Sequence, residues 1–432
     1  MRKFRVFLLM LFVLVVALSA SALALRAQDA SLLVNAADMQ GEISPYVYGS
    51  NYGPWNLIPV AMQPLAAESG LTHFRFPGGN YGDQFPASHL NIDLFMMQAR
   101  SWGIEPSISV RMEGGTPEQA AEVVNYVNVV KGYNVRQWSI GNEPDLFDGY
   151  TVERYNEEWR AFADAMEAVD PSIVLIGPDV SQFPSTIEGN EYLNVRREWV
   201  RSFLEVNGDR VDIVSVHRYP FPTSNSAPPT TIADLRNEAP NWDTLVENLR
   251  TVIQDTVGHE MPMAITEANS NWTNVIGGEA SPDTLPGAIW WADVLGRLIR
   301  QRLTIVDHFA FFSSGDIGGG MGLIGRSGAR PVYYVYQLYQ QFGTELIASA
   351  STDPDVSITA ALRDDGALTV MIVNRAEEAR TLPLEIASFT ASGEATAWRL
   401  DSEHNGEEIG TVALSEALEL PALSATLYVI PG

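Results

Sequence analysis

Short runs of apolar and β-branched residues alternate with segments of helical periodicity between residues 46 and 342. The runs have the length and composition of buried strands. They cover residues 46–50, 72–76, 106–111, 135–141, 172–177, 211–217, 262–267 and 306–312. This alternation of strand and helix is typical of an α/β fold with a parallel sheet.

Four of the intervening segments carry clear helix signals. In the segment 116–131, Thr116 and Gln119 have the spacing of a capping box, Pro117 occupies the first turn, and Gly132 follows the end. The other helices are predicted at 152–169, around 290–298 and at 333–342. Eight strand–helix units over roughly 300 residues favour a (β/α)8 TIM barrel over a doubly wound sheet.

The pattern changes after residue 342, where no long helical segment follows. Alternating apolar and polar residues occur at 357–363, 367–374, 380–386, 395–400 and 424–430. Turn sequences such as Asp365-Gly366 and Asn405-Gly406 separate them. We therefore predict a C-terminal antiparallel β-sandwich over residues 343–432. A further strand at 31–35 precedes the barrel and is a candidate to pair with this sandwich.

The N-terminal residues have the order of a secretory signal. Arg2, Lys3 and Arg5 precede an apolar run, and small residues follow it up to Ala27. We predict a signal peptide over residues 1–27, a barrel domain over 28–342, and a secreted, periplasmic or extracellular bacterial protein. The alternative is an uncleaved anchor, because weakly apolar sequence continues to Leu25. No later segment is long and apolar enough to span a membrane, so no integral membrane domain is expected after cleavage.

Composition excludes several classes of function. There are 27 Lys+Arg against 53 Asp+Glu, which gives a net charge of −26 and argues against nucleic acid or an anionic membrane as a partner. The absence of cysteine excludes disulfides, thiolate metal sites and cysteine catalysis. Lys3 and Lys131 are the only lysines, so Schiff-base chemistry has almost no candidate.

Two predicted strands end in glutamate. Glu143 follows the fourth strand in Trp-Ser-Ile-Gly-Asn-Glu-Pro, and Glu267 ends the seventh in Met-Ala-Ile-Thr-Glu. Active sites of TIM barrels lie at these carboxyl ends. A structural, salt-bridged carboxylate is the alternative at each position, because a buried carboxylate without a partner is costly. Two carboxyl groups that face each other across a cleft are the minimal apparatus for glycosidic cleavage, with one protonated and the other ionised.

Several motifs resemble clan A retaining glycoside hydrolases. The Asn-Glu-Pro after the fourth strand, the glutamate of the seventh and the sandwich after the barrel carry this likeness. Residues 141–146, 215–220 and 266–270, followed by 288–296, look most like glycoside hydrolase family 79, the family of β-glucuronidases and heparanase. Residues 43–53 and 74–80 resemble that family and, equally, the arabinofuranosidase and xyloglucanase families.

The resemblance implies a role for each matching residue. Glu143 matches the general acid/base and Glu267 the nucleophile. Asn142 matches an asparagine that binds the substrate 2-hydroxyl, and Arg75 an arginine that keeps the nucleophile ionised and oriented. His217 and Tyr219 match residues that line the site, with the tyrosine hydroxyl bonded to Glu267. A lone histidine on a strand can equally be a core residue with satisfied hydrogen bonds.

Two further residues are candidates for sugar binding. Asn80 follows two glycines in a loop that would admit the sugar, although a plain turn explains the glycines almost as well. Trp272 lies five residues after Glu267 and is a candidate stacking platform, with a covering role at a domain contact as the alternative. The eighth strand ends in Phe311-Phe312-Ser313, where many clan members have a tryptophan.

We predict no cofactor and no catalytic metal. The six histidines lack paired metal-ligand spacing. Residues 320–325 fit the pattern G-x-G-x-x-G, but Gly325 does not open a predicted helix, so a loop is favoured over a dinucleotide site.

Together these features predict a secreted retaining glycoside hydrolase that acts on a carbohydrate by double displacement, with carboxyl groups about 5–5.5 Å apart. The family 79 resemblance implies a β-glucuronide or uronic-acid glycan, whose carboxylate requires backbone N–H groups, tyrosine or arginine as donors. Arg218, Arg326 and Arg330 are candidates by position only. The alternatives are an α-L-arabinofuranosidase, a β-glucan or xyloglucan hydrolase, or a glycan-binding barrel without catalysis.

Overall fold

The computed structural model describes residues 30–432 except 56, 86–87, 187–190, 222–227, 273–277 and 315–319. The signal peptide predicted over residues 1–27 lies outside the described residues. None of the helices in the described part of the chain combines the length and apolar character needed to cross a membrane.

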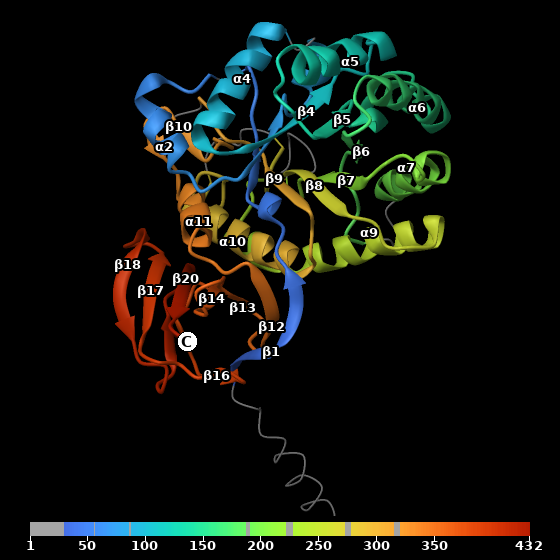
Figure 1. Ribbon diagram of the computed structural model, residues 1–432. Helices are drawn as coiled ribbons and strands as arrows, with labels where there is room; N and C mark the ends of the chain where they lie inside the picture. Colours follow the sequence, from blue (N-terminus) through green and yellow to red (C-terminus); the bar gives the residue numbers. More distant parts are fainter. Residues whose placement is uncertain are drawn as a thin grey trace, which may run out of the picture.

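Eight parallel strands close into a barrel, which confirms the predicted (β/α)8 architecture (Figure 1). Each predicted run overlaps one of these strands. In chain order they are β2 (Gly49–Asn51), β3 (His73–Phe76), β4 (Glu105–Val110), β5 (Gln137–Ile140), β6 (Val174–Val180), β7 (Ile213–Arg218), β8 (Met263–Ala268) and β9 (Ile305–His308).

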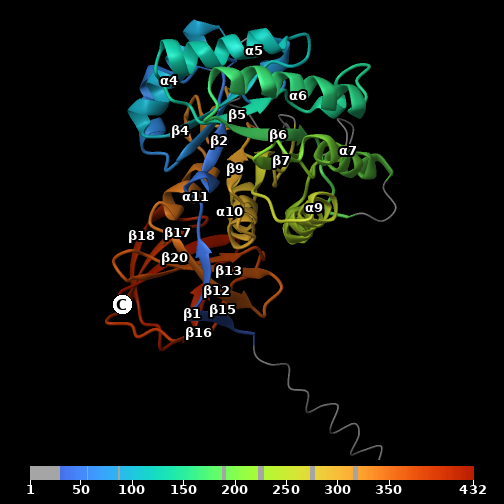
Figure 2. The same cartoon turned by 45° about the vertical axis from the view of Figure 1, so that its right-hand side comes forward.

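Helices surround the barrel (Figures 1 and 2). The longer ones are α4 (His89–Trp102), α5 (Pro117–Val124), α6 (Val152–Val169), α7 (Glu191–Asn207), α9 (Asn241–Val257), α10 (Leu285–Arg300) and α11 (Pro331–Tyr339). The short helices α2 (Gln63–Ala67), α3 (Tyr81–Gln84) and α8 (Ile232–Glu238) lie in connecting segments. The predicted helix 152–169 is confirmed as α6.

The capping box of α5 is confirmed. The Gln119 N–H donates to Thr116 Oγ1 over 3.3 Å, and the Thr116 N–H donates to Gln119 Oε1 over 3.1 Å. The helix continues as a π-helical turn, η3 (Asn125–Val130), so the predicted span 116–131 is helical in two geometries. Gly132 follows with a φ of +61°, a conformation in which a helix commonly ends at glycine.

The C-terminal part contains an eight-stranded sheet in the order β16-β1-β12-β13-β14-β20-β17-β18. Its strands are β1 (Leu32–Glu42), β12 (Glu345–Ser351), β13 (Val356–Leu362), β14 (Leu368–Asn374), β16 (Leu384–Ala387), β17 (Ala395–Leu400), β18 (Asn405–Val412) and β20 (Ser424–Ile430). A second sheet pairs β15 (Arg380–Leu382) with β19 (Leu418–Leu420). All pairs are antiparallel except β1 with β16. The strand predicted at 31–35 therefore lies in the C-terminal sheet.

The C-terminal sheet contributes to two hydrophobic cores. Met371, Val373 and Leu427 belong to the same buried cluster as the barrel helices, whereas Val370, Ile372 and Tyr428 belong to a second cluster on the far side. Strands β13, β14 and β20 contact α10, and β17, β18 and β20 contact α11. The barrel and the sheet thus share apolar surface, with α10 and α11 between them (Figure 2).

Candidate active site

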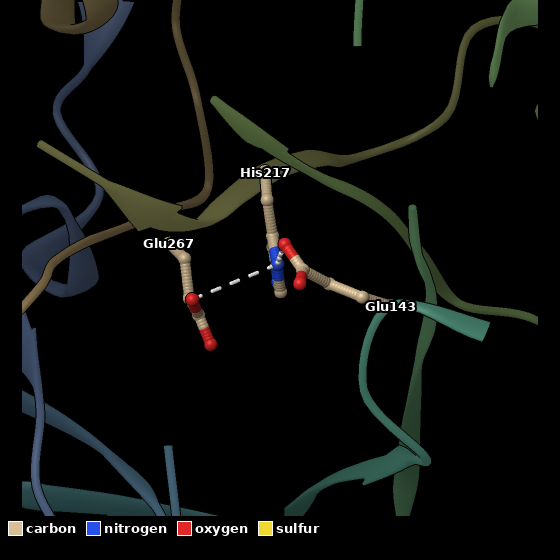
Figure 3. Close-up of side chains that lie close together, drawn as sticks. All are labelled: Glu143, His217 and Glu267. Carbon is tan, nitrogen blue, oxygen red and sulfur yellow. Dashed lines mark hydrogen bonds and ion pairs between the residues drawn. The ribbon is translucent and has the colours of Figure 1, made fainter. Parts of the chain in front are cut away.

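Two glutamates face each other at the carboxyl ends of the barrel strands. Glu143 follows β5 and Glu267 lies near the end of β8, while His217 from β7 lies between them (Figure 3). One oxygen of each glutamate and a ring nitrogen of His217 lie within 4.8 Å of one another. The barrel closure therefore brings together two carboxyl groups that are 124 residues apart in the sequence.

Glu267 is held by three hydrogen-bond donors. Its Oε1 accepts from Arg75 Nη1 over 2.7 Å and from the Gly79 N–H over 2.8 Å. Its Oε2 accepts from the Tyr219 hydroxyl over 2.7 Å. Burial and Glu267 raise the pKa of Tyr219, so the phenol stays protonated and donates. The donors match an ionised carboxylate and fix the orientation of its oxygens.

A side chain at position 79 would be strained and crowded in this arrangement. The φ of Gly79 is +64°, in the left-handed region that favours glycine. A Cβ atom here would lie 3.1 Å from Phe309 Cε2 and 4.0 Å from Glu267 Oε1. The glycine therefore allows the backbone N–H to approach the carboxylate.

Arg75 connects the polar residues beneath the two glutamates. It is fully buried, and besides Glu267 it donates to Asn51 Oδ1, Asn142 Oδ1 and Asp179 Oδ2 at 2.9 to 3.1 Å. Burial acts to lower its pKa, but the carboxylates of Asp179 and Glu267 outweigh burial and raise the pKa above the ordinary arginine value. Arg75 is therefore a permanent cation that compensates the buried negative charge.

Glu143 has a different environment from Glu267. Burial, followed by the nearby Asp145, raises the pKa of Glu143 to about 8, with Arg75 acting in the opposite direction. One of its oxygens lies 3.1 Å from Nδ1 of His217. At neutral pH Glu143 is therefore mostly protonated, which is the state required of a proton donor.

The backbone at Glu143 is also unusual. Its φ of +49° lies in the left-handed region, which a residue with a side chain seldom adopts. The strain is balanced by a hydrogen bond from the Glu143 N–H to the Asp179 carbonyl over 3.1 Å. Asp179 itself has a φ of +54°. Strained residues of this kind concentrate at functional sites.

His217 is neutral in this environment. Burial lowers the pKa of this histidine, although the carboxylates of Glu267 and Asp179 act against that shift. Its Nδ1 also lies 3.8 Å from Glu267 Oε2, so the ring touches both glutamates. His217 is therefore more than a core residue with satisfied hydrogen bonds, because its ring contacts both glutamates.

Asn142 and Asn80 are coupled to each other. Asn142 is 2% exposed, accepts from Arg75 and donates through Nδ2 to Asn80 Oδ1 over 2.8 Å. Its backbone N–H donates to Asp83 Oδ2 over 2.7 Å. Asn80 is exposed and lines the cleft, so of the two asparagines it is the more accessible to a ligand.

A cleft of about 740 Å³ opens above the glutamates. Both glutamates line it, together with Tyr219 and Trp272, and the Trp272 side chain is 42% exposed. Its described lining is completed by Gly79, Asn80, Leu146, Ser181, Gln182, Leu193, Arg218, Pro220 and Phe309. This volume falls in the range of clefts that bind small molecules.

Phe309, the residue directly after β9, the eighth strand of the barrel, is an aromatic residue that lines the cleft. The expectation that placed the strand end at Phe311 and Phe312 was wrong, because β9 ends at His308. Phe311 is fully buried and packs against Phe74 at 4.8 Å between ring centroids. Phe309 instead contacts Tyr219 edge to face at 6.3 Å.

The three arginines considered for an acidic sugar differ in position. Arg218 lines the cleft, and its Nε has no hydrogen-bond partner among the described residues. Arg330 donates to Ser313 Oγ over 2.7 Å and to the Gly322 carbonyl over 2.8 Å. Arg326 is exposed.

Glu143, His217 and Glu267 could in principle ligate a metal ion, because their donor atoms lie close together. However, both oxygens of Glu267 already accept hydrogen bonds, and the adjacent Arg75 is a permanent cation. A metal ion at this position would therefore lie next to a cation and compete with the three hydrogen-bond donors of Glu267. The pattern at 320–325 ends in strand β10 (Ile324–Gly325), and α11 begins only at Pro331.

Sequence reasoning missed three buried carboxylates of the site. Asp179 lies one residue before the end of β6, so the rule that identified the glutamates could have found it if the predicted strand had been extended past residue 177. Asp83 accepts N–H donors from Met112 and Asn142, and Asp145 accepts from Ser181. Their partners are distant in the sequence, so no local signal marks them.

No protein-family model and no curated protein matches the chain. Solved structures with the same fold include a bifunctional glucanase-xylanase from a metagenome library, which is 19% identical with a TM-score of 0.73 over 94% of this chain and 99% of that chain. An α-L-arabinofuranosidase from Thermotoga maritima is 17% identical, with a TM-score of 0.73 over 93% and 99%. A Paenibacillus polymyxa xyloglucanase from glycoside hydrolase family 44 is 15% identical, with a TM-score of 0.71 over 94% and 100%.

At these identities the likeness shows a common fold, which spans both the barrel and the C-terminal sheet. It agrees with the fold that the clan A resemblance implies. None of the three structures is described as a member of family 79.

Proposed function

We propose that this protein is a retaining glycoside hydrolase with Glu267 as the nucleophile and Glu143 as the general acid/base. One observation carries the proposal: two carboxyl groups in unlike environments have oxygens within 4.8 Å of each other. Retaining enzymes place these groups about 5–5.5 Å apart, whereas inverting enzymes need about 6.5–9.5 Å to admit a water molecule. The spacing therefore supports retention.

The two glutamates take different chemical roles in this proposal because their environments differ. Glu267, oriented by Arg75, Gly79 and Tyr219, attacks the anomeric carbon while the protonated Glu143 donates its proton to the departing oxygen. A glycosyl ester on Glu267 results. Glu143, now a carboxylate, removes a proton from water, and the hydroxide attacks the same carbon and releases Glu267.

Replacement of the nucleophile tests the mechanism. Glu267→Ala should abolish turnover of a 2,4-dinitrophenyl glycoside, and azide should restore turnover with formation of a glycosyl azide of inverted configuration. Unchanged turnover in this variant would contradict the assignment. Binding of glycans without turnover by the wild-type enzyme, across nitrophenyl glycosides and polysaccharides, would favour the glycan-binding barrel instead.

We propose a neutral sugar as substrate, an α-L-arabinofuranoside or a β-linked glucan, xylan or xyloglucan. Structures with this fold are described as an arabinofuranosidase, a xyloglucanase and a glucanase-xylanase. The net charge of −26 also disfavours an anionic polymer unless the cleft supplies a cation.

A uronide is the second candidate substrate, because Arg218 lines the cleft and is a cation. Burial lowers the pKa of Arg218, and Glu238 acts against that shift. A panel of nitrophenyl arabinofuranoside, xyloside, glucoside and glucuronide distinguishes the two. Preference for the glucuronide, lost in Arg218→Ala, would establish the acidic substrate and overturn the neutral one.

The signal-like N-terminus supports export of such an enzyme to the site of polymeric substrates. Fractionation of expressing cells, with N-terminal sequencing of the mature chain, tests this part of the proposal.

A further inference from the structure

A second hollow, of about 290 Å³, adjoins the cleft on the side of Glu267. The two share Gly79, Asn80 and Phe309 in their linings. Because the Gly79 N–H binds Glu267, the second hollow begins directly beside the proposed nucleophile. Its described lining comes from segments that follow β2, β3 and β9, and includes no residue from β5 to β8.

Aromatic side chains form one wall of this hollow. The rings of Trp55 and Phe309 lie nearly parallel, at 12° between planes and 6.1 Å between centroids. Tyr81 adjoins Trp55 at 5.8 Å, tilted by 48°. Flat aromatic faces of this kind bind the apolar C–H face of a sugar ring, while hydroxyl and amide groups at their edges bind its hydroxyls.

Polar groups are available at the edges of this wall. Asn80 uses Oδ1 to accept from Asn142, so its Nδ2 can donate to a ligand. The Tyr81 hydroxyl makes no hydrogen bond to another described residue. The hollow therefore combines a stacking surface with polar groups, which is the composition of a sugar site.

The positions of the two glutamates define the direction of a bound chain. Glu143 protonates the departing oxygen, so the leaving part of the substrate lies on its side. The sugar that is attacked lies against Glu267 and Gly79. A further sugar attached to it, away from the bond that is cleaved, extends past Gly79 and Phe309 into the second hollow.

We propose that this hollow binds a second sugar unit on the non-leaving side, stacked on Trp55, and that the enzyme therefore acts on substrates with more than one sugar on that side. The proposal rests on the proposed function, because the glutamates define the two sides. An enzyme that removes single terminal sugars would need this side closed.

Aryl glycosides isolate the effect, because the nitrophenyl group occupies the leaving side and each added sugar extends only toward Trp55. The pairs are nitrophenyl xyloside and xylobioside, glucoside and cellobioside, and arabinofuranoside and its α-1,5-linked disaccharide. In the series that the enzyme turns over, kcat/KM should be at least about tenfold higher for the disaccharide, equivalent to about 1.4 kcal/mol. Trp55→Ala should reduce this ratio to below about threefold, and Trp55→Phe should retain most of it.

Trp272→Ala is the comparison variant, because Trp272 lines the main cleft but not the second hollow. It should change both substrates of a pair alike and leave the ratio intact. If Trp55→Ala does not fold, the ratio of kcat/KM for the disaccharide to kcat/KM for the monosaccharide glycoside in the wild-type enzyme still tests the proposal. Turnover of the monosaccharide glycoside that depends on Glu267, with a ratio near one, would overturn this proposal and leave the glycosidase intact. No turnover of any pair would overturn both.

Discussion

Protonation of Glu143 determines the pH range in which the proposed reaction can run. Glu143 has a pKa of about 8, because burial and Asp145 outweigh the influence of Arg75. Above that value it loses the proton that the departing oxygen requires. We expect kcat/KM for an alkyl glycoside to fall about tenfold for each pH unit above pH 8.

A substrate that needs no acid provides the control. A dinitrophenyl glycoside should show a much weaker alkaline decline, and Glu143→Gln should lose about 10²–10⁴-fold on the alkyl glycoside and far less on the dinitrophenyl one. Equal losses on both substrates would argue against Glu143 as the acid.

Asp145, two residues after Glu143 in the sequence, raises the pKa of Glu143. It lies 3.1 Å from Arg196 Nε and accepts the Ser181 N–H over 2.8 Å, so its charge is held close to Glu143. Asp145→Asn removes a negative charge that raises the pKa of Glu143 and leaves Arg196, which lowers it. The alkaline limb of kcat/KM should therefore move to lower pH.

The exposed Asp148, in the same segment, is the matched control. Asp148→Asn removes the same charge outside the buried network and should leave the pH profile in place. If Asp145→Asn instead loses activity at every pH and the alkaline limb of kcat/KM stays in place, Asp145 has only a structural role.

The segment after β3 contributes a single backbone donor to the nucleophile. Gly79→Ala places a Cβ 3.1 Å from Phe309 Cε2 in a left-handed conformation that strains alanine, and we expect the resulting shift to weaken the hydrogen bond from the N–H to Glu267. Loss of one aligned donor should reduce kcat about 10–100-fold. The measurement is steady-state kinetics on an activated glycoside.

Gly103, which follows α4, is the control for the cost of placing alanine in a left-handed backbone conformation. It has a similar φ of +70°, and no other atom lies within 4 Å of a Cβ built there. Gly103→Ala should cost about 1 kcal/mol in stability and leave kcat unchanged. An equal loss of kcat in both variants would show that the loop, and not the donor, is responsible.

The elements themselves could be read from the sequence because their signals are local. The capping box at Thr116 and the position of Glu267 near the end of β8 are each marked by a few neighbouring residues. The surroundings of these glutamates could not be read in the same way. Asp83 reaches Asn142 across 59 residues, and Trp55 meets Phe309 only when the barrel closes. Such contacts depend on the closed tertiary structure, which no local pattern encodes.

The barrel and the C-terminal sheet are tied together at both ends of the chain. The first described strand, β1, lies in the C-terminal sheet between β16 and β12. The described chain therefore starts in this sheet, forms the barrel from β2 to β9 and then re-enters the sheet at β12. Arg300 of α10 donates to the Ile358 carbonyl over 2.8 Å and to Thr359 Oγ1 over 2.6 Å, both in β13. We therefore expect the two parts to unfold as one unit.

A buried ion group joins the two parts and tests this coupling. Asp293 of α10 is fully buried and lies 3.1 Å from Arg297 Nε and 3.0 Å from Nε of Arg375, which follows β14. Burial acts to raise the pKa of Asp293, but the two arginines outweigh it and hold the pKa below its usual value. Asp293→Ala leaves the buried Arg375 without a carboxylate partner, whereas Arg297 keeps its ion pair with Asp243. The free energy of unfolding should therefore fall by about 3–5 kcal/mol.

The exposed pair of Arg363 with Asp365 is the control, and Asp365→Ala should cost less than about 1 kcal/mol. Urea unfolding followed in parallel by protease cleavage within the C-terminal sheet and by residual activity measures both. If the parts are coupled, the two signals of Asp293→Ala shift together to lower urea. Activity that persists after the C-terminal sheet becomes sensitive to protease would instead mean that the barrel holds its site without that sheet, because every residue assigned to the chemistry lies between β3 and β9.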